Sequence, residues 1–215
     1  MQQSVELRRE DLKEEYNLEQ FDAYMTVKAF FDKASGDEVT ALKQMISSYL
    51  DFRAETSEFL TRSCAEVCGD ICFKTGLSDC CMHEGIITFF ADWIVNWLVS
   101  SKEETDVLLN ALYEPFRDDK CVYLGPLGCL WKIKPLNCET FVCKQARADI
   151  FLKNPEAEQV YEDMLKKKKT FSFPDRPVLF DSIEKFFMDR GVDSETMYFH
   201  KGAGLLLIKQ KAGVV

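Results

Sequence analysis

The chain has 215 residues, of which 47% are hydrophobic and 29% charged, a composition that is ordinary for a globular protein with one sizeable core. Its formal net charge of −9 makes the surface acidic, and an acidic surface repels phosphate backbones, so we expect no nucleic acid partner. The charged N-terminus lacks the apolar segment of a signal peptide, and the most apolar stretch, residues 85–101, is too short to span a bilayer. We therefore expect a cytoplasmic protein that binds no membrane.

The first third of the chain is predicted to be helical. Residues 5–33 are rich in Glu, Lys, Leu and Phe and fit one or two helices. Gly36 is a helix stop, and Asp37 is a candidate N-cap for a second helix that continues without Gly or Pro to Gly69. The three-four spacing of a buried stripe is carried by Leu42, Met45, Ile46, Tyr49 and Phe52.

The apolar stretch after residue 85 predicts a core helix with a narrow polar side. Asp92, Asn96 and Ser100 recur every four residues, which places them on one side of a helix. The opposite side carries Phe89, Phe90, Trp93, Ile94, Trp97 and Leu98. A further helix is expected from about Ser101 to Tyr113, because its first residues resemble a capping box.

Residues 114–145 differ in character from the helical flanks. They hold three prolines, two glycines and four cysteines, so we expect short strands and loops that something other than core packing holds together. Beyond them, Asn154 and Pro155 fit an N-cap and first helical position, and another helix is expected to end at Gly191. Two apolar runs around residues 201–204 predict a C-terminal β-hairpin.

These elements together predict a mainly α-helical protein with a loop-rich cysteine centre and a small C-terminal β-hairpin. The segments 1–63, 64–145 and 146–215 are a helical N-terminal part, a cysteine-rich core and a helical part with the hairpin. We expect them to form one compact domain, because no long linker separates them.

All nine cysteines lie between residues 64 and 143. Thiols stay reduced in the cytoplasm, and an odd number cannot be used up by a closed set of disulfides. Cysteine clusters in that setting are typical of metal or redox sites.

The first group is Cys64, Cys68 and Cys72. The four-residue spacing aligns them on one face if the preceding helix continues, with neighbouring β-carbons roughly 5–6 Å apart, and Gly69 could instead loosen the turn and wrap the chain around a metal. Thiolates at this spacing can converge on one metal, because a Zn–S bond is about 2.3 Å long. The alternative is a set of small buried side chains, since free cysteine buries well.

The adjacent Cys80 and Cys81 form a second feature, and His83 follows closely. Two neighbouring cysteines can point to opposite sides of the chain, into two metal sites or into one site and the core. His83 is a candidate ligand through its neutral imidazole or, alternatively, a surface histidine after a turn. Three nearby carboxylates are candidates for outer-shell or occasional ligand roles, or are solvated loop charges: Asp70, Asp79 and Glu84.

The second group is Cys121, Cys129, Cys138 and Cys143. Spacings of eight, nine and five residues suit a looped segment that returns repeatedly to one point. The alternative is four buried thiols in an irregular part of the core. A segment with so many helix and strand breakers favours an external staple, and bound metal contributes directly to folding.

The cysteine pattern resembles that of the YkgJ-like, or CxxCxxCC, cysteine-cluster family of zinc- or iron-chelating proteins. The resemblance rests on "CVYL" (121–124), "GCLW" (128–131) and "KPLNCETFVC" (134–143), and it covers residues 64–143 but not the flanks. It implies that the cysteines bind zinc or iron, with an iron–sulfur cluster and more than one centre as further options.

Three departures separate this chain from the family pattern. The spacings in the first cysteine block are longer than the family's. Lys134-Pro135 stands in place of Arg-Pro, and Cys138-Glu139 in place of Cys-Arg. A role of the family arginines in binding an anion or substrate therefore does not transfer to this chain, whereas the cysteines themselves are retained.

Three functions remain open from the sequence. The first is metal binding through all-thiolate ligation, which suits zinc or an iron–sulfur cluster. The second is an iron–sulfur-dependent enzyme of the redox or methyl-transfer type, since some proteins with this cysteine pattern look like such enzymes. No nucleotide-binding, hydrolase or C-x-x-C motif is present, and the C-x3-C-x2-C spacing of radical enzymes is missed by one residue. The third is a thiol-based regulatory module with an unknown protein partner.

Metal binding is the function that the sequence favours, with one cysteine of the nine as a bystander. The predicted ligands are Cys64, Cys68, Cys72, Cys80, Cys81, Cys121, Cys129, Cys138, Cys143 and, as an additional candidate, His83.

Overall fold

The computed structural model describes residues 7–77, 80–82 and 87–214. Its elements are the 3₁₀-helix η1 (Arg9–Asp11), α1 (Glu15–Phe31), α2 (Gly36–Cys68), the π-helix η2 (Gly69–Phe73), α3 (Phe90–Val99), α4 (Lys102–Ala111), β1 (Leu124–Gly125), β2 (Gly128–Cys129), α5 (Leu136–Glu139), α6 (Lys144–Ile150), α7 (Pro155–Ser172), α8 (Leu179–Met188), α9 (Tyr198–Lys201) and α10 (Ala203–Ala212). The mainly helical class is confirmed.

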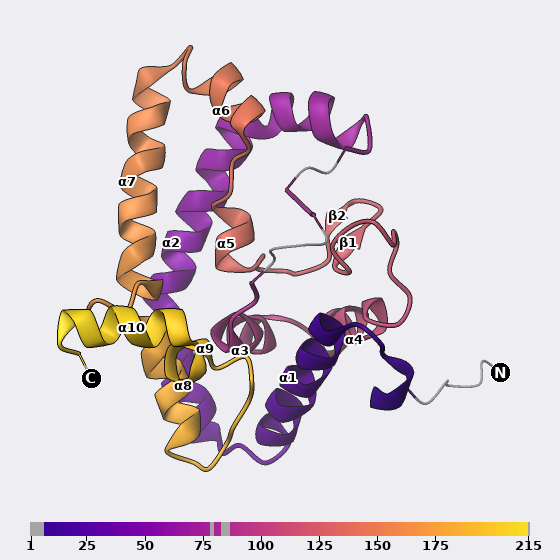
Figure 1. The fold of residues 1–215 in the computed structure, drawn as a ribbon, viewed down its shortest axis with the longest axis vertical. Helices are drawn as coiled ribbons and strands as arrows, with labels where there is room; N and C mark the ends of the chain where they lie inside the picture. The colour runs from indigo at the N-terminus through magenta and orange to yellow at the C-terminus, as the bar shows by residue number, and fades with distance from the viewer. Residues whose placement is uncertain (1–6, 78–79, 83–86, 215) are drawn as a thin grey trace.

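The long helix α2 forms the spine of the molecule (Figure 1). α7 runs beside it in the opposite direction, and α6 packs against it near its C-terminal end. α3 contacts both α1 and α8, while β1, β2 and the loops around them lie on the other side of α5 from α2 and α7 (Figure 1). The cysteine-rich loops therefore stand against a helical frame drawn from both ends of the chain.

The start of α2 lies two positions earlier than the sequence predicted. Ser35, rather than Asp37, is the N-cap, and it forms a capping box with Glu38. The Ser35 hydroxyl accepts the Glu38 amide, and the Glu38 carboxylate accepts the Ser35 amide, so two otherwise unpaired donors are satisfied. The predicted apolar stripe is buried, except that Met45 is only partly buried.

Two other predicted helix starts are confirmed. Ser101 caps α4 in a capping box with Glu104, and Asn154 caps α7 with Pro155 in the first turn. Gly191 has a positive φ of 73° after α8, which is the left-handed conformation that glycine adopts at low cost.

The predicted C-terminal hairpin is wrong. Residues 198–201 and 203–212 are helical, and Gly202 between them has an ordinary φ of −72° rather than a left-handed turn conformation. The apolar run of residues 205–208 is too short for periodicity to separate strand from helix. The alanine, leucine, lysine and glutamine residues around it are strong helix formers. The antiparallel pair of strands lies instead at β1 and β2, where Leu124 pairs with Cys129.

One hydrophobic core joins the described parts of all three predicted segments, from Leu12 to Phe199. Trp93 of α3 is fully buried at its centre. Its ring centroid lies 4.5 Å from that of Trp131 and 6.3 Å from that of Tyr123. These contacts attach the loops around β1 and β2 directly to α3.

None of the described helices combines the length and the apolar character that a bilayer span requires.

Candidate metal centre

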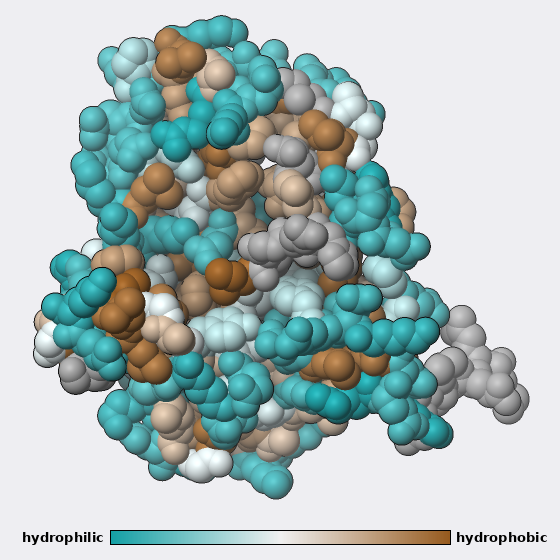
Figure 2. Space-filling view, viewed as in Figure 1, coloured by the Kyte–Doolittle hydropathy of each residue, from teal (hydrophilic) through white to brown (hydrophobic). Residues whose placement is uncertain are grey.

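All nine cysteines lie within the described ranges, and all nine are free thiols. Seven of them line a single cavity of about 560 Å³, although they come from chain segments some fifty residues apart. These seven are Cys68, Cys72, Cys80, Cys81, Cys121, Cys129 and Cys138. The space-filling view of the same face shows hydrophobic residues scattered among hydrophilic ones (Figure 2).

The first wall of the cavity comes from the C-terminal end of α2 and the π-helical turn η2. An α-helix turns about 100° per residue, so a four-residue step overshoots a full turn by about 40°. A π-helical turn is wider and turns less per residue, so the step from Cys68 to Cys72 loses that overshoot. The change in helix type therefore keeps Cys64, Cys68 and Cys72 on one side of the helix, as the spacing predicted.

Cys143, from the second cysteine segment, lies near this wall but does not line the cavity. It caps α6, and its sulfur accepts the amide of Ala146 at 3.4 Å. α6 packs on α2, and the thiol of Cys143 interacts electrostatically with Cys64 and Cys68. We call Cys64, Cys68, Cys72 and Cys143 the helix group.

The second wall is built by backbone pairing. The amide of Cys121 donates to the carbonyl of Cys81 at 3.0 Å, beside an isolated antiparallel bridge between Met82 and Lys120. The β1–β2 hairpin then returns the chain, so that Cys129 lies opposite Leu124.

Cys138 completes this wall from α5. It interacts electrostatically with Cys121 and Cys129. We call Cys81, Cys121, Cys129 and Cys138 the hairpin group.

Burial and mutual repulsion oppose ionisation of most of these thiols. The pKa of Cys121 is raised to about 11 and that of Cys138 to about 12, mainly by burial and in part by neighbouring cysteines. The pKa of Cys64 is raised to about 11, first by burial and then by Cys68 and Cys143. Negative thiolates so close together need a cation to offset their repulsion.

At the hairpin group, hydrogen bonds from backbone N–H groups favour ionisation of the thiols and lower their pKa values. Those of Tyr123 and Leu124 lower the pKa of Cys121, and that of Trp131 lowers the pKa of Cys129, although burial keeps both pKa values raised overall. Such N–H groups stabilise a thiolate, and they surround the sulfur ligands of metal–thiolate sites for the same reason.

Cys80 and Cys81 differ from the other thiols because they hydrogen-bond to each other. That bond lowers the pKa of Cys81 and raises the pKa of Cys80. Cys80 is exposed, and it interacts electrostatically with cysteines of both groups. It lines the same cavity as they do.

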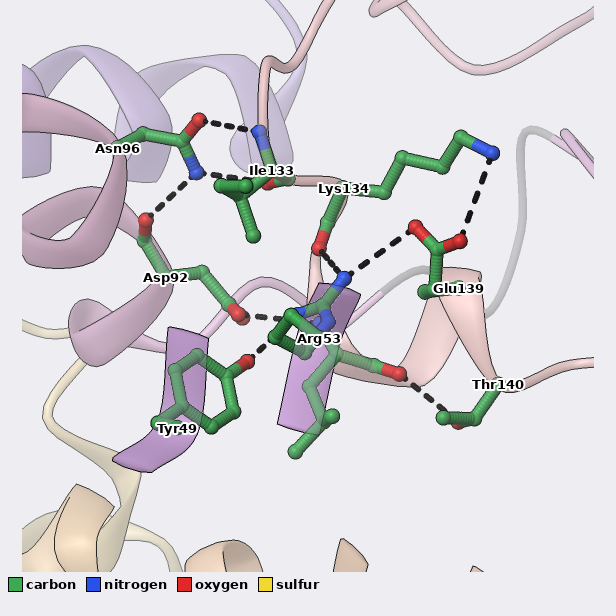
Figure 3. A network of polar contacts seen from close by, with 9 residues as sticks. Tyr49, Arg53, Asp92, Asn96, Ile133, Lys134, Glu139 and Thr140 are labelled. Carbon is green, nitrogen blue, oxygen red and sulfur yellow. Dashed lines mark hydrogen bonds and ion pairs between the residues drawn. The ribbon is translucent and has the colours of Figure 1, made fainter. Parts of the chain in front are cut away.

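A buried polar network fixes the second wall to the helical frame (Figure 3). The Arg53 guanidinium of α2 donates to the Tyr49 hydroxyl at 2.6 Å and to the Lys134 carbonyl, and it pairs with the Glu139 carboxylate at 3.3 Å. Asn96 of α3 exchanges two hydrogen bonds with the backbone of Ile133, at 2.7 and 2.9 Å. These hydrogen bonds hold the backbone of Ile133 and Lys134, in the segment between β2 and Cys138, against α2 and α3.

Asp92 provides a further tie from α3. Its carboxylate accepts the amides of Phe89 and Leu136, each at 3.0 Å, and burial raises the pKa of Asp92 to about 6. The four-residue recurrence of Asp92 and Asn96 was visible in the sequence. Arg53 was missed, although a charged residue four positions after Tyr49, in the buried stripe of α2, was an available signal.

Of the four candidate outer-shell or additional ligand residues near the cysteines, the structure describes one. Asp70 is exposed and forms an ion pair with Lys74, as expected of a solvated charge. His83, Asp79 and Glu84 lie outside the described residues. Within residues 7–77, 80–82 and 87–214, no group of three or more His, Cys, Asp or Glu side chains is arranged so that it could hold a metal ion as it stands.

Thiolate binding to one metal therefore requires side chains and loops at the cavity to close in. The donor set still fits zinc or iron chemically, because soft thiolates are the ligands that both zinc sites and iron–sulfur clusters use.

Comparison with known protein families, curated proteins and solved structures finds no match for this chain. The resemblance to the cysteine-cluster family remains a prediction.

Proposed function

We propose that this protein binds metal, zinc or iron, through its clustered cysteines. The observation that carries the proposal is the meeting of seven free thiols from two distant segments at one cavity. Buried apolar packing alone does not account for this arrangement, because six of these seven thiols are only partly buried and Cys80 is exposed. The metal would supply a positive charge that offsets thiolate repulsion and would join the two walls.

The proposal has a direct experiment. The protein is purified without oxygen, its visible absorption is recorded, and its zinc and iron contents are measured by elemental analysis. A brown protein with sulfur-to-iron absorption supports an iron–sulfur cluster, and a colourless protein with stoichiometric zinc supports a zinc–thiolate site. A metal-free protein that is soluble and fully folded, and that takes up neither metal on reconstitution, would overturn the proposal.

A thiol-based regulatory module is the second candidate, because of one specific observation. Cys80 is exposed and donates to Cys81, whose pKa is lowered, so Cys81 is the better nucleophile of the pair. Alkylation with limiting iodoacetamide, mapped by mass spectrometry, tests this. Preferential labelling of Cys81 over the more exposed Cys80 supports the module, and the reverse order contradicts it.

A further inference from the structure

We infer that Cys81 and Cys121 form a reversible disulfide when the protein meets a hydroperoxide, which makes them a redox-sensitive link between two distant segments of the chain. The inference goes beyond the proposed metal binding and does not depend on it, because a disulfide needs only a pair of neighbouring sulfur atoms. It also gives the thiol-based candidate function a specific product.

The backbone places the two cysteines directly opposite each other. Met82 and Lys120 form an antiparallel bridge, so the residue before Met82 faces the residue after Lys120. These residues are Cys81 and Cys121, and the Cys121 amide donates to the Cys81 carbonyl at 3.0 Å. Opposite residues in such a hydrogen-bonded pair have side chains on one face and Cα atoms about 5.5 Å apart. Disulfides most often join Cα atoms about 5.5–6 Å apart.

The surroundings of the pair agree with this register. After its hydrogen bond to Cys80, the strongest interaction of Cys81 with another thiol is the electrostatic one with Cys121. Both side chains are partly buried and line the cavity of about 560 Å³, which gives a small hydroperoxide access to their sulfur atoms. Within the described residues the bridge beside them is isolated rather than part of a longer strand pair, so the two segments can shift slightly as the sulfurs approach.

The cysteines along α2 and η2 suit a disulfide less well. Cys64, Cys68 and Cys72 follow one another at four-residue steps, and the β-carbons of helix neighbours at that step lie roughly 5–6 Å apart. A disulfide needs β-carbons about 3.5–4.5 Å apart. Opposite residues of an antiparallel pair, with β-carbons about 4.5–5.5 Å apart, come closer to that requirement.

Two other pairings near the hairpin are also less favourable. Cys80 and Cys81 are joined by one peptide bond, so a disulfide between them closes a small ring that strains this planar bond. Cys129 lies opposite Leu124 rather than opposite a cysteine. Cys121 is therefore the partner that the backbone presents to Cys81.

The reaction balances with the hydroperoxide as the oxidant. The thiolate of one cysteine attacks a peroxide oxygen, so an S–O bond forms, the O–O bond breaks, and an alcohol, or water from hydrogen peroxide, leaves. The thiolate of the other cysteine then attacks the sulfenic sulfur, the S–S bond forms, and the S–O bond breaks with loss of water. The sulfur atoms lose the electron pair that the peroxide gains. A dithiol reductant restores both thiols by thiol–disulfide exchange.

The test treats the reduced full chain with one equivalent of hydrogen peroxide in the presence of a chelator, because bound metal would compete for the same thiols. Free thiols are counted by iodoacetamide labelling. The disulfide is mapped by mass spectrometry after digestion with trypsin and chymotrypsin, since cleavage after Tyr123 separates Cys121 from Cys129. The inference predicts a loss of two of the nine free thiols, a Cys81–Cys121 linkage, and recovery of both thiols with dithiothreitol.

Two variants separate the proposed pair from its surroundings. Cys121→Ser should leave Cys81 without a disulfide, whereas the matched control Cys129→Ser, at the same cavity, should form the linkage as the unchanged protein does. In the unchanged protein, a linkage of Cys81 to Cys80, Cys129 or Cys138, or no disulfide at all, would overturn the inference even if a variant fails to fold. Metal content is measured separately on protein purified without oxygen, so these results leave the proposed function to its own experiment.

Discussion

Arg53 is a charged side chain within the buried stripe of the longest helix. Its guanidinium is enclosed with the Glu139 carboxylate, the two side chains being 3% and 8% exposed. It also stacks over the Tyr49 ring, with 5.4 Å between the guanidinium carbon and the ring centroid. A buried ion pair of this kind is costly to break from one side, because the remaining charge loses its partner while it stays out of water. Arg53 therefore ties α5 to α2.

Arg53→Leu should lower the free energy of unfolding by about 3–5 kcal/mol, the usual cost of leaving a buried charge unpaired. Urea denaturation measures the change. Arg62→Leu, on the exposed side of the same helix, is the control and should change stability by less than about 0.5 kcal/mol. Equal effects of the two substitutions would show that the Arg53 contacts do not hold α5.

Cys138→Ser should reduce the amount of bound metal and lower the melting temperature, because the hairpin group loses a thiolate and with it part of the folding free energy that metal contributes. Cys143→Ser should have a similar effect through the helix group. Elemental analysis and thermal denaturation check both. Unchanged metal content and melting temperature in Cys138→Ser and Cys143→Ser would contradict their assignment as ligands.

The junction of α8, α9 and α10 contains a second buried polar cluster, away from the cysteines. Glu184 of α8 accepts the Phe199 amide at 3.2 Å and hydrogen-bonds to His200 Nδ1 at 2.9 Å. Burial raises the pKa of Glu184 to about 8, and burial lowers the pKa of His200. Both are therefore uncharged at neutral pH, while Asp181 pairs with the buried Lys209.

This junction predicts a pH dependence of stability. Glu184 has a higher pKa in the folded than in the unfolded chain, so unfolding releases a proton and the free energy of unfolding falls as pH rises from about 4 to about 8. Between pH 7 and 8, where His200 is mostly neutral in both states, the loss should be about 1 kcal/mol. Glu184→Gln should abolish it in urea denaturation. The exposed Glu195→Gln should keep it, and an unchanged slope in Glu184→Gln would refute the assignment.

The sequence was most informative where one local interaction decides the structure. Caps at Ser101 and Asn154 were predicted because a single side chain satisfies the first turn. The C-terminal run failed because its four apolar residues fit either periodicity, and the strong helix formers around it favour the helix. The capping residue of α2 was misplaced by two positions because Ser35 and Asp37 have equivalent cap chemistry.

The candidate site was predictable in its residues but not in its arrangement. Spacing placed Cys64, Cys68 and Cys72 on one side of a helix, and that prediction is confirmed by α2 and η2. The pairing of Cys81 with Cys121 is a contact between segments forty residues apart, and no local pattern specifies such a contact. The same holds for Arg53, whose partners Lys134 and Glu139 are distant in sequence.

The molecule as a whole links two cysteine-bearing segments to one helical frame. The helix group stands at the end of α2, and the hairpin group is attached to α3 through the aromatic contacts of Trp131 and the network around Asn96. The cavity lies between these attachments. A metal bound there would join the two halves of the cysteine region and stabilise an irregular segment that has little secondary structure of its own.

X-ray absorption at the edge of the bound metal, recorded on the protein purified without oxygen, tests the central claim most directly. The account predicts a first shell made of sulfur alone, at about 2.3 Å from the metal if it is zinc, and loss of signal amplitude in both Cys72→Ser and Cys129→Ser. A folded protein without zinc or iron, or a metal whose first shell is nitrogen and oxygen, would contradict it.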